Sequence, residues 1–135
     1  MSEDGTLTTQ LVLLADDNEE MSTVIEDMLD FLGFEVAVAR DGRTAVEMAA
    51  ANAYTLILMD IEMPVMDGLA AAEAIRLREQ ADLTPAVPIL GITGHTDRGT
   101  HLLCQRAGMN DVLTKPFLMV QLEEKVKAAC GARLN

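Results

Sequence analysis

The sequence predicts a single α/β domain, in which a doubly wound parallel sheet of five strands is covered by helices on both faces. Short apolar runs alternate along the chain with stretches of helical period, which is the pattern of successive βα units. Several of the runs are apolar at every position, as expected for strands buried on both faces. The length of 135 residues suits one domain with a proper core.

The predicted strands are short apolar runs that end at polar or turn-forming residues. They cover residues 10–15, 34–39, 55–59, 87–92 and 111–113. Between them, apolar residues recur at helical spacing, which predicts helices over residues 18–32, 43–52, 68–80, 97–107 and 117–130. Residues 81–88 contain two prolines and are predicted to form a loop.

The first and last helices carry the clearest apolar stripes. In the first helix the stripe is capped by Asp17 or Asn18 and ends at Gly33. Its members are Met21, Val24, Ile25, Met28, Leu29 and Leu32. In the last helix the predicted stripe is Leu118, Leu122, Val126 and Ala129.

The composition limits the classes of function. Lys and Arg number 10 and Asp and Glu 22, so the net charge of −12 argues against direct binding of nucleic acid or of an anionic membrane. Such a charge suits a basic partner or bound cations. Cys104 and Cys130 lack metal-ligand spacing and are expected to be thiols in a reducing compartment. No apolar run approaches the roughly 18 residues of a membrane span, and residues 1–10 lack signal-peptide features, so we expect a cytoplasmic protein.

Asp60 is the predicted chemical centre. The apolar run Leu56 to Met59 leads directly into it, and ligands of open α/β sheets bind at the carboxyl ends of strands. Other polar residues follow the neighbouring strands and should converge on the same edge. They are Asp16 and Asp17 after the first strand, Thr93 at the end of the fourth and Lys115 after the fifth.

This set of groups favours phosphoryl chemistry on a metal site. Three crowded carboxylates repel one another, and a divalent cation relieves the repulsion. Few hard oxygen ligands, all from loops, are typical of Mg²⁺. A lysine and a threonine instead suit a phosphoryl group beside the metal, and an aspartate can accept that group covalently.

Each signal alone has an ordinary structural explanation. Asp16 and Asp17 could only cap a helix, Asp60 could only end a strand, and Thr93 with Gly94 could be a simple turn. The pair formed by Lys115 and Pro116 could be a plain strand-to-helix junction. Their joint occurrence at the ends of four strands favours the functional interpretation. His101, on the fourth helix, is expected at the surface.

At this point four segments resemble the receiver domain of two-component response regulators, and the resemblance covers residues 11–129. The segments are LLADDN (13–18), LILMDIEMPVMDG (56–68), PILGITGH (88–95) and GMNDVLTKPF (108–117). The resemblance implies a flavodoxin-like (βα)5 sandwich with strand order 2-1-3-4-5. It places a receiver domain over residues 10–130, with a tail over 131–135. The polar composition of residues 1–9 predicts a flexible start.

The resemblance also implies residue roles. Asp60 corresponds to the phosphoacceptor, while Asp16 and Asp17 with the backbone carbonyl of Glu62 correspond to ligands of Mg²⁺, for which Mn²⁺ can substitute. Thr93 corresponds to the switch hydroxyl. Lys115 corresponds to the lysine that pairs with the phosphoryl group, and its bond to Pro116 resembles one that is cis in the family.

Two features bear on how this chain would switch: a departure from the family pattern at one position, and the residues at two positions that set the lifetime of the phosphorylated state. Three residues before Lys115 the family usually carries Tyr or Phe, and here the residue is Val112. Signalling would then run through loop and helix shifts without a ring flip, or the switch would be muted. Glu62 and His95 each lie two residues after Asp60 or Thr93, at positions that set the lifetime of the acyl phosphate in the family. His95 could equally be an exposed loop residue.

The resemblance implies a sensor histidine kinase or a histidine phosphotransfer protein as phosphodonor, and an unidentified downstream protein. That protein would bind the face made by the fourth helix, fifth strand and fifth helix. We expect a monomer with no nucleic-acid or membrane partner, whose only chemistry is autocatalytic phosphotransfer and autodephosphorylation. The chain could be a stand-alone regulator, slightly favoured by its start at Met1, or a receiver of a hybrid kinase.

Two other classes stay open at this stage. A pseudo-receiver would bind partners without phosphate, and Val112 leaves room for it. A phosphatase of the haloacid dehalogenase type also uses a strand-end aspartate with Mg²⁺, and Asp60-Ile61-Glu62 faintly matches its DxD pair. That family carries its acidic residues in a different order and needs a cap.

Overall fold

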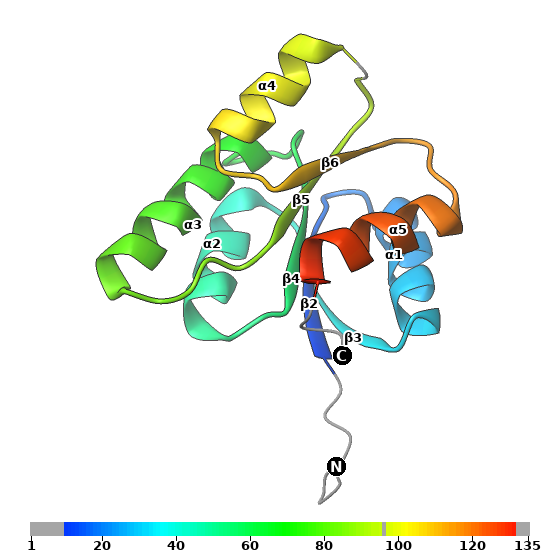
Figure 1. Ribbon diagram of the computed structural model, residues 1–135, viewed down its shortest axis with the longest axis horizontal. Helices are drawn as coiled ribbons and strands as arrows, with labels where there is room; N and C mark the ends of the chain where they lie inside the picture. The colour runs from blue at the N-terminus through cyan, green and yellow to red at the C-terminus, as the bar shows by residue number, and fades with distance from the viewer. Residues whose placement is uncertain (1–9, 96, 132–135) are drawn as a thin grey trace, which may run out of the picture.

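The computed structural model describes residues 10–95 and 97–131, and the predicted flexible start over 1–9 and tail residues 132–135 lie outside this range. One parallel sheet runs through it in the order β3-β2-β4-β5-β6, which is the predicted order 2-1-3-4-5 (Figure 1). The strands are β2 (Gln10–Ala15), β3 (Phe34–Ala39), β4 (Leu56–Asp60), β5 (Ile89–Thr93) and β6 (Asp111–Thr114). The helices are α1 (Glu19–Phe31), α2 (Gly42–Ala51), α3 (Gly68–Asp82), α4 (Arg98–Arg106) and α5 (Met119–Cys130).

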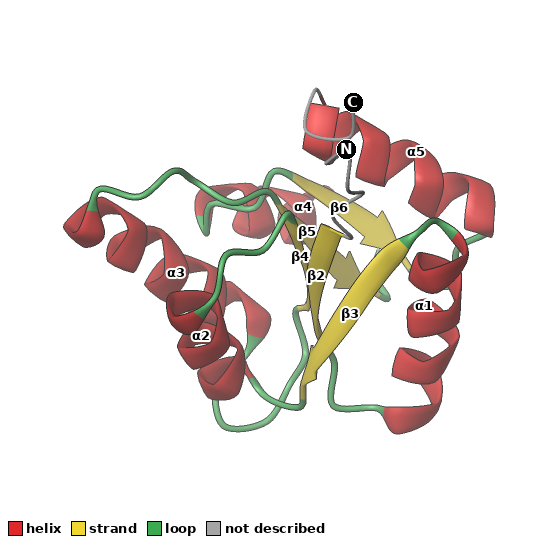
Figure 2. Ribbon diagram, turned by 90° about the horizontal axis from the view of Figure 1, so that it is seen from below, coloured by secondary structure: helices red, strands yellow, loops and turns green. Residues whose placement is uncertain are grey.

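Helices cover both faces of the sheet. Figure 2 shows α1 and α5 on one side and α2, α3 and α4 on the other. Alternate residues of each central strand enter the two cores: in β4, Ile57 and Met59 pack towards α2 and α3, while Leu56 and Leu58 pack towards α1 and α5. This double burial explains why β2, β4 and β5 read as continuous apolar runs.

The register of the sheet aligns the strand ends. Ala15 pairs with Met59, Asp60 with Ile92, and Thr93 with Thr114. The residues that follow β2, β4, β5 and β6 therefore lie at one edge, as the sequence predicts.

Four helices begin at a polar side chain that accepts the backbone N–H three residues on. Asn18, and not Asp17, caps α1 by accepting from Met21 at 2.8 Å. Asp41, Asp67 and Asp97 cap α2, α3 and α4 in the same way. These backbone hydrogen bonds stabilise the charged carboxylates and lower the pKa of Asp41 and of Asp97.

The structure corrects the predicted loop over residues 81–88 and the predicted start of the fourth strand. Helix α3 continues to Asp82, because residues 68–84 contain no proline, and it ends where Leu83 adopts a left-handed conformation with φ 56°. Strand β5 begins at Ile89 and not at residue 87. Pro88 has no N–H to give to a ladder, although its carbonyl still accepts from Ile57.

The start of the last helix is also corrected. α5 begins at Met119, two residues later than predicted, after a turn that contains the cis peptide bond Lys115–Pro116. Leu118 is the N-cap and its side chain is 67% exposed, so its place in the predicted apolar stripe is wrong. The buried face of α5 is formed by Leu122, Val126 and Cys130.

Both cysteines are buried, and burial raises the pKa of the Cys104 thiol. Among the described residues, no helix is long and apolar enough to cross a bilayer.

Gly68 lets the start of α3 approach the end of β4. A Cβ at this position would overlap the carbonyl oxygen of Asp60 and lie 2.7 Å from Cα of Ile61. Gly68→Ala is therefore expected to lower the free energy of unfolding by about 1–3 kcal/mol, measured by urea denaturation. Gly94→Ala is the control, because a Cβ there meets nothing within 4 Å. Equal stability of the Gly68→Ala variant and the wild type would contradict this close approach.

Candidate functional site

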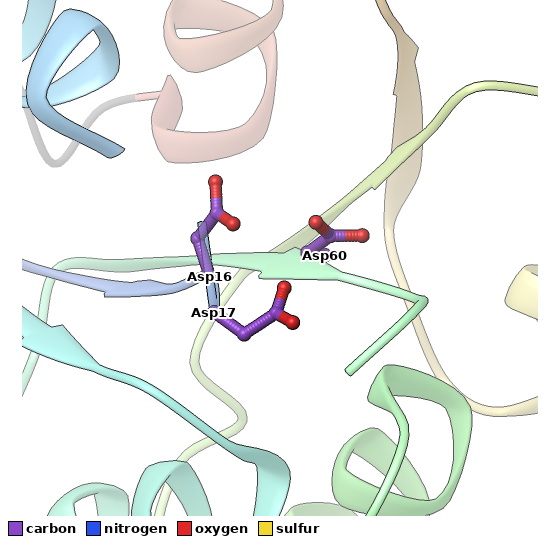
Figure 3. Close-up of side chains that lie close together, drawn as sticks. All are labelled: Asp16, Asp17 and Asp60. Atoms are coloured by element: carbon purple, nitrogen blue, oxygen red, sulfur yellow. The ribbon is translucent and has the colours of Figure 1, made fainter. Parts of the chain in front are cut away.

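Three carboxylates gather where β2 and β4 end. Asp16 and Asp17 follow β2, and Asp60 is the last residue of β4 (Figure 3). Each offers an oxygen, and these oxygens lie within 4.8 Å of one another. Asp16 is 1% exposed and Asp60 4%, whereas Asp17 is exposed. The convergence predicted from the sequence is therefore present.

Asp60 is held at both oxygens. Oδ1 accepts the backbone N–H of Glu62 at 3.0 Å, and Oδ2 accepts from Nζ of Lys115 at 3.2 Å. The Lys115 side chain is 25% exposed, so this ion pair is partly shielded from water. The predicted lysine thus reaches across β5 to the predicted aspartate.

Asp16 carries an unmet polar atom. Its Oδ1 accepts the N–H of Asn18 at 2.9 Å, but its Oδ2 is buried and has no hydrogen-bond partner among the described residues. Burial raises the pKa of the Asp16 carboxyl, and the nearby charges of Asp60 and Asp17 raise it further. The bond from Asn18 and the charge of Lys115 oppose this rise in part. The site therefore has uncompensated negative charge, which a divalent cation would neutralise.

Thr93 lies at the end of β5 and is 1% exposed. Its Oγ1 accepts the backbone N–H of His95 at 3.0 Å, and its carbonyl accepts the N–H of Lys115 at 2.7 Å. In the register Thr93 is one residue beyond Ile92, the partner of Asp60. The hydroxyl is thus bonded to the β5–α4 loop, next to the strand that carries Asp60.

The side chains of Glu62 and His95 meet at the rim of the site. His95 Nε2 lies 3.2 Å from Glu62 Oε2, and both side chains are more than half exposed. The sequence singled out both residues but did not predict their contact. The signal was available, because each lies two residues beyond the neighbouring ends of β4 and β5. The contact joins the loops that follow these two strands.

Val112 is buried at 8% exposure in the middle of β6, beside Gly91 of β5. Next to it a hollow of about 570 Å³ lies between α4 and α5. Its lining includes His101, Val112, Gln121 and Lys125. His101 is exposed, as expected.

The comparisons with known proteins agree with this geometry. The family model described as the response regulator receiver domain matches residues 12–127. The chain belongs to this family, and it is a receiver domain of two-component signalling with an acidic pocket formed by Asp16, Asp17 and Asp60. The family serves signalling and is not one of classical enzymes, which leaves the phosphatase alternative without support.

Three relatives illustrate the family. The chain is 36% identical over 124 residues to the sensor protein GacS of Pseudomonas syringae pv. syringae. The aligned region covers 92% of this chain but only 14% of GacS. It is 39% identical to the receiver domain of sensor histidine kinase PA1611 from Pseudomonas aeruginosa, solved with magnesium in its active site cleft. That structure has a TM-score of 0.83 and covers 93% of this chain and 100% of the other.

The third relative was solved in a complex. It is the receiver domain of Ssk1 from Saccharomyces cerevisiae, crystallised with the histidine phosphotransfer protein Ypd1. It is 25% identical, with a TM-score of 0.87, and covers 96% of this chain and 94% of the other.

The unpartnered Asp16 Oδ2 has a consequence for stability. In chelator-treated protein, Asp16→Asn is expected to raise the unfolding temperature by a few degrees, which corresponds to about 1 kcal/mol in the free energy of unfolding. The reason is that the amide keeps the bond from Asn18 and removes a buried charge. Circular dichroism melting measures the unfolding temperature, with Asp30→Asn, at an exposed position, as the control. Added Mg²⁺ should stabilise the wild type and not Asp16→Asn. A lower unfolding temperature for chelator-treated Asp16→Asn would contradict this account.

Proposed function

We propose that this domain accepts a phosphoryl group on Asp60 from a partner's phosphohistidine and reports it through the face formed by α4, β6 and α5. The observation that carries the proposal is the buried Asp16 Oδ2 without a partner, beside an Asp60 carboxylate that Lys115 already holds. The pocket thus offers Asp16 Oδ2 to a cation and Nζ of Lys115 to an anion. This is the arrangement that phosphoryl transfer needs.

The donor set fits Mg²⁺. Asp16, Asp17 and Asp60, with the backbone carbonyl of Glu62, would hold the ion, and Mn²⁺ could substitute for it. All four ligands are hard oxygens on loops or a strand end, and the site has excess negative charge. When bound, the ion would supply positive charge that offsets the negative charge of the carboxylates and of the phosphoryl group. The magnesium in the cleft of the PA1611 receiver supports this proposal.

Transfer itself needs little from the protein beyond position and charge. A carboxylate oxygen of Asp60 attacks phosphorus, an O–P bond forms, and the N–P bond to the partner's imidazole breaks with its electron pair left on nitrogen. Lys115, now 3.2 Å from Asp60, then pairs with the phosphoryl oxygens. Hydrolysis of the resulting acyl phosphate, at a rate influenced by Glu62 and His95, ends the signal.

The switch would begin at Thr93. Its hydroxyl now accepts from the N–H of His95, and donating to a phosphoryl oxygen would draw the loop before α4 towards Asp60. Val112 leaves no aromatic ring on β6 to follow this movement. The change would therefore reach the face of α4, β6 and α5 as a shift of the loop and helix, beside the hollow next to Val112.

The partners follow from the chemistry. A sensor histidine kinase or a histidine phosphotransfer protein would donate the phosphoryl group, as the pairing of the Ssk1 receiver with Ypd1 supports. The output would be a protein contact of a monomeric receiver domain over residues 10–130, in the cytoplasm. The domain would act alone or within a hybrid kinase.

Asp60→Asn is expected to abolish phosphorylation by acetyl phosphate with Mg²⁺, because an amide oxygen is a poor nucleophile. Intact mass spectrometry measures this result: the wild type gains the mass of one phosphoryl group, and Asp60→Asn does not. Asp111→Asn serves as a matched control, since Asp111 is bonded to Lys125 away from the site. Labelling of Asp60→Asn at the wild-type rate would refute the assignment.

The wild-type arm of this experiment tests the pseudo-receiver alternative, which predicts no mass gain. A separate assay, turnover of a generic phosphate ester, tests the phosphatase alternative.

Lys115→Ala is expected to leave labelling possible but to uncouple it from any structural change, because the variant lacks the amine that now bonds Asp60 and would pair with the phosphoryl oxygens. Amide chemical shifts of α4 and β6 before and after acetyl phosphate measure the coupling. Wild-type shift changes in the labelled Lys115→Ala protein would count against this role.

A further inference from the structure

Arg40 lies directly after β3 and reaches the acidic loop between β2 and α1. Its Nη1 donates to the backbone carbonyl of Asp16 at 3.3 Å and to Oγ of Ser22 at 2.8 Å. The first acceptor belongs to the loop and the second to α1. One guanidinium nitrogen therefore joins the end of β3 to two successive parts of the chain.

The contact completes the hydrogen bonding of the Asp16 backbone. The N–H of Asp16 donates to the carbonyl of Ala39 at 2.9 Å, and Oδ1 accepts from Asn18. With Arg40 on its carbonyl, only Oδ2 of Asp16 lacks a partner among the described residues. Since that carbonyl belongs to the peptide unit between Asp16 and Asp17, Arg40 fixes the orientation of this unit and so the direction in which Asp17 leaves it.

Ser22 anchors the other end of the contact. It is fully buried, and its hydroxyl donates to the carbonyl of Glu19 at 3.0 Å while accepting from Arg40. A buried hydroxyl in this geometry holds the guanidinium in place, although much of the Arg40 side chain is exposed. The acidic loop is thus fixed between β3 on one side and α1 on the other.

We propose that Arg40 is a positioning residue for the cation site: it holds the peptide between Asp16 and Asp17 so that their carboxylates keep the spacing a divalent cation needs. The inference rests on the proposed function, because it takes these carboxylates as cation ligands. Groups that orient ligands commonly control metal affinity without touching the metal.

The sign of the effect separates positioning from charge. A guanidinium near an anionic site repels a cation, so charge alone predicts that removing Arg40 leaves Mg²⁺ affinity unchanged or makes it tighter. Positioning predicts weaker affinity. Arg43 is the matched control, because it carries the same charge on the first turn of α2 and is exposed.

The experiment is isothermal titration of the full chain with Mg²⁺. Arg40→Met is expected to weaken binding about tenfold and Ser22→Ala by a smaller factor, about two- to threefold, since Ser22→Ala keeps the bond to Asp16. Arg40→Lys should recover part of the loss, because a single nitrogen serves both acceptors. Arg43→Met should bind as tightly as the wild type or slightly more tightly.

Circular dichroism melting without metal distinguishes positioning of the cation ligands from a purely structural role of Arg40. A purely structural role would lower the unfolding temperature of Arg40→Met and leave its Mg²⁺ affinity unchanged. Wild-type or tighter affinity in Arg40→Met overturns the proposal. If Arg40→Met does not fold, unchanged affinity in Ser22→Ala overturns it. If the wild type does not bind Mg²⁺, the proposed metal site is overturned as well. If the wild type binds Mg²⁺ and Arg40→Met binds it equally tightly, only the role of Arg40 is overturned.

Discussion

Repulsion among Asp16, Asp17 and Asp60 is the constraint on which the rest of this structure depends. Two of these carboxylates are almost fully buried, and their oxygens converge within 4.8 Å. A fold keeps such a cluster only if other interactions hold it in place. Here the parallel sheet fixes the strand ends, Lys115 supplies one positive charge, and Asp16 Oδ2 remains without a partner. The proposed divalent cation would relieve this repulsion.

Hydrogen bonds connect the cluster to the strands and loops around it. Thr93 and His95 connect the end of β5 to the loop before α4, and Lys115 connects β6 to Asp60. The proposed change of charge at Asp60 would therefore act on the ends of β5 and β6 and on the loops that follow them. α4 buries only Cys104 within its length, fewer residues than any other described helix buries.

The sequence predicts the fold and the convergence of the site well, because both follow from apolar period and from residues at strand ends. The predicted element boundaries near 81–88 and 117 are wrong, because α3 continues to Asp82 before a left-handed Leu83, and α5 begins only at Met119, after Leu118 as N-cap. Neither position carries a strong local sequence pattern. The positions of Glu62 and His95, each two residues beyond the ends of neighbouring strands, bring their loops together, but the contact itself depends on side-chain direction. The bonds of Arg40 also depend on side-chain direction, and linear spacing gives no signal for them.

The central claim is that Asp60 receives the phosphoryl group. The most direct test is borohydride reduction of the protein after acetyl phosphate and Mg²⁺, because this reagent converts an aspartyl phosphate to homoserine at the phosphorylated position. Peptide sequencing by mass spectrometry should then find homoserine at position 60 only. Homoserine at position 16 or 17, or unchanged aspartate at all three positions, would contradict the account.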